Sequence, residues 1–95
     1  MLSINEISKA VAIVANEFEI KKIFLFGSYA DGTNTPESDV DLLVEFFSDA
    51  VSLLTLSAIK IRFEELLNIQ VDIIHGPIDN NSIIEPKKVV EIYAA

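Results

Sequence analysis

Three aspartates and a Gly-Ser pair are the residues of this chain whose types and spacing indicate chemistry. Asp39 and Asp41 lie two positions apart in an apolar stretch, and ten residues separate Ser28 of the Gly27-Ser28 pair from Asp39; Asp72 lies in a later apolar stretch. Alternate residues of a β-strand point to the same face with Cα atoms about 7 Å apart, so two carboxylates placed this way repel each other unless a cation lies between them. Because Mg²⁺ prefers carboxylate oxygens, the pattern predicts a divalent-metal site.

Asp72 and the Gly-Ser pair complete a set of groups suited to phosphate chemistry. Asp72 stands between two apolar residues, as Asp41 does. Gly27 has no Cβ, so a phosphate can approach its backbone, and Ser28 offers a hydroxyl group and amides at the start of a helical turn. Alone, the Gly-Ser is usually a turn, an Asp-x-Asp is often a solvated strand end, a helix cap or a calcium loop, and a lone strand aspartate is often an exposed edge residue. Together they are the groups that two-metal phosphoryl or nucleotidyl transfer needs.

Helices and strands must alternate along the chain to bring these residues together. Ser3 and Glu6 have the spacing of a capping box, and apolar residues follow them at helical intervals. The expected elements are a helix from 3 to about 17, a strand over 23–26, a helical turn over 28–31 ended by Gly32, a strand over 39–46, a helix after the N-cap Ser52 to 67, a strand over 70–74 and a last helix from Pro86. The predicted fold class is α/β (α+β), a small mixed β-sheet with helices in α-β-α-β-α-β-α order.

The strand directions follow from the need to form one site. Gly27 ends the first strand and Asp39 begins the second, so these strands must be antiparallel for the two residues to meet. Asp41 and Asp72 both lie early in their strands, and the helix between those strands makes a normal right-handed crossover, which predicts parallel neighbours. The acids then gather at one end of the sheet.

Composition argues against several classes of protein. A length of 95 residues, half of them hydrophobic, predicts a single domain over residues 1–95. With no cysteine, no apolar run near the roughly 20 residues of a membrane span and no signal-peptide pattern, we expect a cytoplasmic protein without a membrane partner. The net charge is −8, and no Lys or Arg lies between Lys22 and Lys60. Direct binding of nucleic acid, including an end-adding activity on nucleic acid, is therefore disfavoured.

Gly27-Ser28, ten intervening residues and Asp39-Val40-Asp41 resemble the signature of the polymerase-β-like nucleotidyltransferase superfamily. The Phe-Gly-Ser-Tyr-Ala context, the run 38–44 and the later run 71–74 resemble its minimal nucleotidyltransferase (MNT) branch, which includes antitoxins encoded beside HEPN-domain toxins. The resemblance covers essentially the whole chain, and it implies the nucleotidyltransferase fold.

The resemblance also implies roles for the candidate residues. Asp39 and Asp41 would hold two Mg²⁺ ions that bridge the triphosphate of ATP, and Asp72 would be the third metal-binding and catalytic carboxylate. Gly27 and Ser28 would bind the β- and γ-phosphates. AMP would pass to a tyrosine hydroxyl of a HEPN toxin and silence it. So small a chain is expected to need a partner chain to complete the site, in a homo- or hetero-oligomer.

One residue departs from the family pattern, which commonly reads Gly-Ser-x-Ala-Arg-Gly. Here Asp31 stands where the family has arginine. Close to a bound phosphate this exchange reverses an interaction worth on the order of 1 kcal/mol. It leaves open an alternative: a catalytically weak or inactive MNT-fold binding module that neutralises a toxin by contact.

Other residues are expected to have structural roles. Tyr29 could stack on a base or accept AMP, but packing is the favoured interpretation. His75, at the end of the third strand, could contact substrate or metal, but a structural role is favoured. Lys60 and Glu64 are expected to form an i,i+4 ion pair on a solvated helix face. The stripe that includes Leu53, Leu56 and Phe63 is expected to lie in the core.

Overall fold

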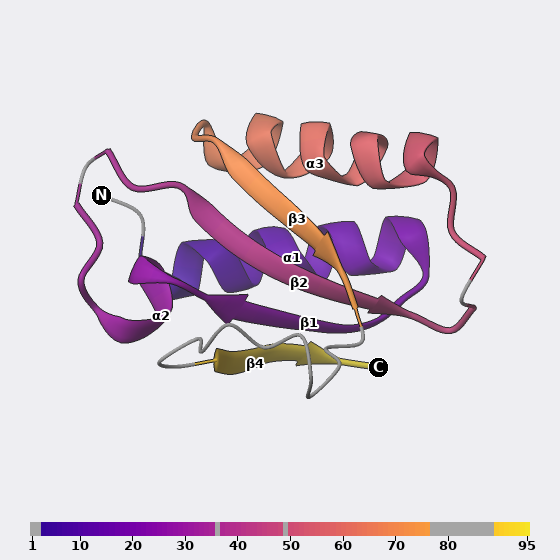
Figure 1. Ribbon diagram of the computed structural model, residues 1–95, viewed down its shortest axis with the longest axis horizontal. Coiled ribbons are helices and arrows are strands. Elements are labelled where there is room, and N and C mark those ends of the chain that lie inside the picture. The colour runs from indigo at the N-terminus through magenta and orange to yellow at the C-terminus, as the bar shows by residue number, and fades with distance from the viewer. Residues whose placement is uncertain (1–2, 36, 49, 77–88) are drawn as a thin grey trace.

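A four-stranded sheet in the order β3-β2-β1-β4 organises the computed structural model, which describes residues 3–35, 37–48, 50–76 and 89–95 (Figure 1). Its neighbouring strands are antiparallel except for β2 and β3. The elements in chain order are α1 (Ile4–Phe18), β1 (Ile20–Phe26), α2 (Ser28–Asp31), β2 (Val40–Phe46), α3 (Leu53–Leu67), β3 (Val71–His75) and β4 (Val89–Ala94). The predicted mixed α/β fold class is confirmed.

Local signals fix the ends of the two long helices. The Ser3 hydroxyl accepts a hydrogen bond from the Glu6 N–H, and the Glu6 carboxylate accepts one from the Ser3 N–H, which is the predicted capping box. The Ser52 hydroxyl accepts from the Thr55 N–H and caps α3. Asn68 then ends α3 in the left-handed conformation, as expected for a residue whose short side chain tolerates it.

Both predicted strand directions are confirmed. β1 and β2 are antiparallel, so the end of β1 meets the beginning of β2, and β2 and β3 are parallel neighbours joined through α3. The antiparallel pair is joined by residues 27–39, which include α2, whereas the parallel pair needs a crossover helix. This combination brings the end of β1 and the beginnings of β2 and β3 to one end of the sheet.

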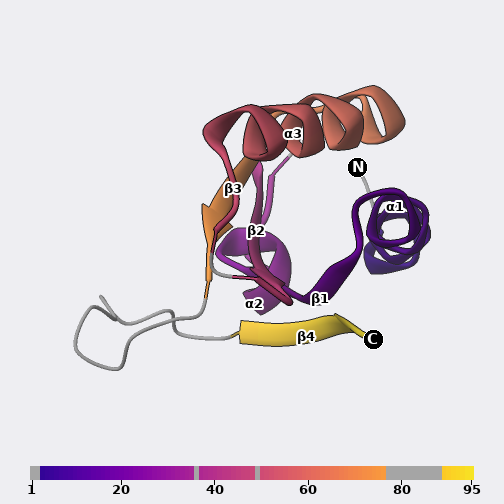
Figure 2. The same cartoon turned by 90° about the vertical axis from the view of Figure 1, so that its right-hand side faces the viewer.

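The helices α1 and α3 cover one face of the curved sheet (Figure 2). Alternate strand residues such as Leu25, Leu42 and Val71 are fully buried against them, together with Val11 of α1 and Phe63 of α3. The residues between these, including the aspartates of β2 and β3, point to the opposite face. No helix in the described part of the chain is long and apolar enough to cross a membrane.

Three expectations about the elements were wrong. Residues 89–94 form a strand rather than the end of a last helix, because Val89, Val90 and Tyr93 suit a strand and the free edge of β1 offers them main-chain partners; Pro86, the expected start of that helix, lies outside the described residues. β1 begins at Ile20 rather than residue 23, since Ile20 is fully buried and leads directly into the sheet. Leu53 is 81% exposed, because α3 buries residues only in its later turns.

Candidate active site

A row of residues across the sheet brings the predicted site together. Phe26 at the end of β1 is the register partner of Asp41 in β2, and Asp41 is the register partner of Asp72 in β3. Register partners point to the same face of a sheet, so the carboxyl groups of Asp41 and Asp72 lie side by side. Asp39 directly precedes β2, and Val40 between the two acids is fully buried on the opposite face. The predicted separation of acidic and apolar residues onto two faces is confirmed.

The environment of Asp41 raises the pKa of its carboxyl group. Partial burial is the largest cause, followed by the charge of Asp72, a hydrogen bond with Asp72 and the charge of Asp39. Asp41 and Asp72 therefore form a close pair, whereas Asp39 contributes the smallest of these effects.

The described residues place no counter-ion against these acids. The salt bridges in this part of the chain join Lys60 to Glu64, and Arg62 to Glu17 and Glu65. None of them includes an aspartate of the site.

Gly27 lies directly against the Asp41 carboxylate. Its φ of 76° and ψ of −154° fall in a region that only glycine adopts readily. A Cβ at this position would overlap Asp41 Oδ2 and lie 3.4 Å from Asp41 Cγ. Ser28 follows as the first residue of α2. The Gly-Ser turn and the acidic row, which consists of Asp39, Asp41 and Asp72, therefore form one candidate site. The sequence pattern suggested a phosphate contact for Gly27 but missed this packing, which depends on the register of β1 and β2.

The donor chemistry of the row fits a divalent metal. The register-paired carboxyl groups of Asp41 and Asp72 and a nearby third acid, Asp39, are oxygen ligands of the kind that Mg²⁺ binds. Within the described ranges, however, no three His, Cys, Asp or Glu side chains already converge as a metal-binding group. Among the predicted ligands, Asp41 and Asp72 are register partners, and Asp39 acts on Asp41 through its charge.

Comparison with known proteins identifies the family to which this arrangement belongs. Residues 7–94 match the family described as nucleotidyltransferase domain. The chain belongs to this family. The prediction of an enzyme of the nucleotidyltransferase type is confirmed at this level, and the motif residues 27–28 and 39–41 fall inside the matched range.

Relatives of the nucleotidyltransferase confirm its resemblance to the minimal branch. A candidate protein adenylyltransferase of Methanocaldococcus jannaschii, MJ0435, is 37% identical over 73 residues, which make up 77% of each chain. The protein adenylyltransferase MntA of Thermococcus cleftensis is 35% identical over 78 residues, or 78% of each chain.

Solved structures share the fold. A candidate minimal nucleotidyltransferase is 32% identical with a TM-score of 0.64, over 76% of this chain and 72% of that one. A chain of a toxin-antitoxin crystal structure with AMP-PNP has a TM-score of 0.77 at 17% identity, over 93% and 73% of the two chains. A chain of the Shewanella oneidensis complex of a tri-AMPylated HEPN toxin with its MNT antitoxin has a TM-score of 0.69 at 15% identity, over 93% and 70%.

Two further residues of the nucleotidyltransferase lie outside the acidic row. Tyr29 is 4% exposed and packs in the core, so it is not available to a base or to AMP. His75 is the fourth residue after Val71 in β3, so it points away from the face of Asp72. Its ring makes an edge contact with Phe46 at a centroid distance of 5.4 Å. The structural interpretation of both residues agrees with these positions.

Asp31, where the resemblance implied an arginine, supports the turn after α2. Its carboxylate accepts hydrogen bonds from the N–H of Thr33, at 3.0 Å, and from the Thr33 hydroxyl. Gly32 between them adopts a left-handed conformation and ends α2. An arginine at this position could not accept these bonds, so an aspartate stabilises this turn in a way that an arginine could not.

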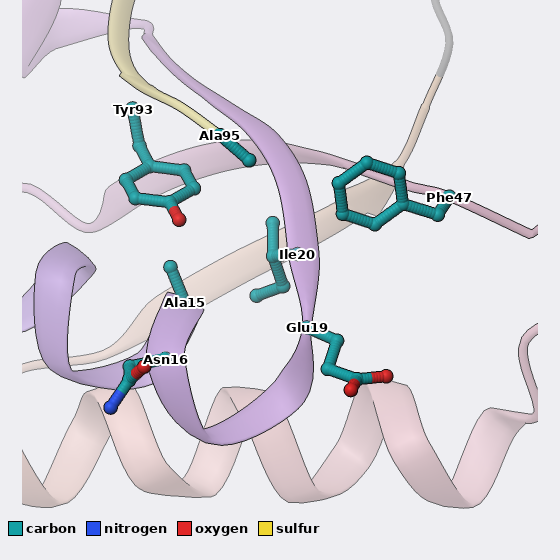
Figure 3. A pocket seen from close by; sticks show the side chains of 7 residues that line it. All are labelled: Ala15, Asn16, Glu19, Ile20, Phe47, Tyr93 and Ala95. Atoms are coloured by element: carbon teal, nitrogen blue, oxygen red, sulfur yellow. The ribbon is translucent and has the colours of Figure 1, made fainter.

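A surface hollow of about 550 Å³ lies at the other end of the sheet (Figure 3). Ile20 at the start of β1, Phe47 after β2, Tyr93 of β4 and the end of α1 line it. None of the predicted site residues does so. The hollow is therefore separate from the acidic row, which lies where β1 ends.

Proposed function

We propose that this chain is an Mg²⁺-dependent nucleotidyltransferase that transfers AMP from ATP to a tyrosine hydroxyl of a HEPN toxin, as the antitoxin of that pair. The observation that carries the proposal is the contact chain from Gly27 to Asp41 to Asp72, which joins a candidate phosphate turn to paired carboxylates. Relatives named protein adenylyltransferases and complexes of MNT antitoxins with HEPN toxins support it.

In this proposal Asp39, Asp41 and Asp72 hold two Mg²⁺ ions. When bound, these ions neutralise charge on the phosphates and stabilise the attacking and leaving oxygens. The open turn at Gly27 and the hydroxyl and amide of Ser28 bind the β- and γ-phosphates. The direct contact between Gly27 and the Asp41 carboxylate sets the position of the phosphate turn relative to the metal-binding oxygens.

The transfer itself is an in-line displacement. The acceptor oxygen forms a bond with the α-phosphorus, the bond from that phosphorus to the β-phosphate oxygen breaks, and pyrophosphate leaves. The hydroxyl proton passes to the carboxylate of Asp72, which is exposed on the open face of the sheet and so accessible to an acceptor on another chain. A net charge of −8 agrees with a protein acceptor rather than a nucleic acid.

Intact-mass measurement of the partner tests the proposal. The protein is incubated with ATP, Mg²⁺ and the HEPN toxin encoded beside it, and we expect the toxin to gain one or more adenylyl groups. The same mixture with EDTA, and one with a toxin whose acceptor tyrosine is phenylalanine, should show no gain at that site. A toxin whose mass stays constant in the complete mixture while its toxicity is neutralised would contradict the proposal.

That contrary result defines the second candidate, a catalytically weak or inactive binding module. The observation that favours it is Asp31, an acid within one helical turn of the phosphate turn. In that case the antitoxin would neutralise its toxin by contact, and neutralisation would survive loss of Asp39 and Asp41.

Substitutions of Asp31 separate its electrostatic effect from its structural one. Asp31→Asn removes the charge but keeps an acceptor for Thr33, whereas Asp31→Arg removes the acceptor and adds the family's cation. We expect Asp31→Arg to bind ATP about fivefold more tightly, as an interaction of about 1 kcal/mol implies, and to lose about 1 kcal/mol of stability with the Thr33 bonds. Asp31→Asn should keep wild-type stability. Calorimetric ATP titration and thermal unfolding measure the two effects, and unchanged ATP affinity in both variants would contradict an electrostatic role.

A further inference from the structure

The first residue of β3 has main-chain groups that no strand of the described sheet satisfies. β3 is an edge strand, with β2 as its neighbour on one side. The Gln70 C=O accepts from the Val40 N–H at 3.0 Å, so Gln70 directs its carbonyl toward β2. In a parallel ladder successive residues alternate in direction, so the N–H and C=O of Val71 point away from β2. A buried or half-buried main-chain group left in this way requires another partner.

Two side chains of α3 supply both partners. The Val71 N–H donates to Glu64 Oε2 at 3.0 Å, and Lys60 Nζ donates to the Val71 carbonyl at 2.8 Å. Lys60 Nζ also donates to Glu64 Oε2 at 2.9 Å, which closes the ring of contacts. Lys60, with Val71, holds the pKa of the Glu64 carboxyl below its ordinary value, so Glu64 stays charged as an acceptor. The pair takes the place of a neighbouring strand at this one residue.

Val71 directly precedes Asp72, so this contact acts on the site. The Val71 side chain is fully buried, and the residues on either side of it, Gln70 and Asp72, pair with β2. The N–H and C=O of Val71 itself bond to Glu64 and Lys60. The backbone next to Asp72 is thus fixed by the core, by β2 and by the side chains of α3. We propose that Lys60 and Glu64 are positioning residues that hold Asp72 in register with Asp41, an inference that rests on the proposed function.

The chain offers a matched control for this pair. Arg62 also lies on α3 and forms an ion pair with Glu17 at 2.9 Å, with side chains 36% and 39% exposed. The exposed fractions of Lys60 and Glu64 are similar, at 41% and 30%. The contacts of Arg62 in the described residues are with carboxylates and not with a strand. Arg62→Met therefore removes a comparable ion pair without touching β3.

The test combines transfer kinetics with two measurements that need no activity. Lys60→Met and Glu64→Ala are expected to lower kcat for adenylyl transfer about 10- to 100-fold, as loss of outer-shell support typically does, with KM for ATP changed less than about twofold because the phosphate turn is untouched. The affinity for Mn²⁺ alone should fall by a similar factor, and amide exchange at Val71 should accelerate. Lys60→Arg keeps a donor and should restore kcat, and Arg62→Met should leave all of these values unchanged.

Each result bears on the proposal in one direction. Wild-type kcat and Mn²⁺ affinity in folded Lys60→Met and Glu64→Ala variants would overturn it, as would equal losses in Arg62→Met. If Glu64→Ala does not fold, Lys60→Met alone is compared with Arg62→Met, and Glu64→Gln, which retains an acceptor for the Val71 N–H, should keep a kcat near the wild-type value. If the wild-type protein transfers no AMP but Mn²⁺ affinity still depends on Lys60 and Glu64, the proposed function fails while the positioning role stands.

Discussion

Asp41→Asn is expected to lose adenylyl transfer and at the same time to stabilise the metal-free protein. The carboxylate of Asp41 is the centre of the acidic row, between Gly27 and Asp72. An amide of the same size removes one charge from the proposed metal site, and the charge stabilisation lost is several kcal/mol. Since each 1.4 kcal/mol is a factor of ten in rate, we expect transfer to fall at least about 100-fold.

The gain in stability has the same physical cause. Burial and the neighbouring aspartates raise the pKa of Asp41, so its charge is unfavourable in the folded state at neutral pH. Removing one of two like charges at register-paired positions should stabilise the fold by on the order of 0.5 kcal/mol. Thermal unfolding in EDTA measures this change. Glu45→Gln is the matched control, because Glu45 lies on the same strand opposite Lys22 and its loss should not stabilise the protein.

The effect of pH has a defined sign. A carboxyl group whose pKa is raised by folding binds its proton more tightly in the folded state, so its contribution to stability is fully present below the ordinary carboxyl pKa and is lost as the pH rises through the raised value. The difference in Tm between Asp41→Asn and the wild type should therefore be largest at neutral pH and should shrink as the pH falls. A difference that is constant with pH, or an Asp41→Asn variant that unfolds at a lower temperature, would contradict repulsion within the row.

Gly27→Ala is the second change with a large expected effect. Its backbone conformation costs an L-amino acid on the order of 1–3 kcal/mol, and the new Cβ would collide with the carboxylate of Asp41. The protein must therefore move either the Gly27-Ser28 turn or the Asp41 side chain. We expect a loss of about 2 kcal/mol in the free energy of unfolding and a fall in transfer of about 100-fold, as a misplacement of about 1 Å typically causes.

Gly32→Ala separates backbone strain from the collision. Gly32 also has a positive φ, of 81°, but a Cβ there would meet no atom within 4 Å. Gly32→Ala should therefore cost about 1 kcal/mol of stability and leave transfer near the wild-type rate. Denaturant unfolding and the toxin mass assay distinguish the two variants. Equal losses of transfer in Gly27→Ala and Gly32→Ala would show that the contact with Asp41 has no importance for the site.

Most of the fold could be predicted from the sequence because its signals are local. The caps at Ser3 and Ser52 and the left-handed end at Asn68 are each decided within four residues. The expected helix over residues 89–94 was wrong because no local signal decides this segment. Val89 and Tyr93 suit a strand or a helix, and the choice depends on the free edge of β1, which is distant in sequence.

The sequence by itself determined which side chains make up the candidate site. Alternation of acidic and apolar residues separates Asp41 and Asp72 from the core, since the period of a strand is two, and the need for Gly27 and Asp39 to meet in one site predicts antiparallel strands. Only the tertiary structure decided how these residues touch. The packing of Gly27 on Asp41 depends on the register between β1 and β2. The hydrogen bonds of Lys60 and Glu64 to the Val71 main chain depend on how α3 lies along the edge strand β3. Both are contacts between elements, for which the spacing of residues in one element carries no signal.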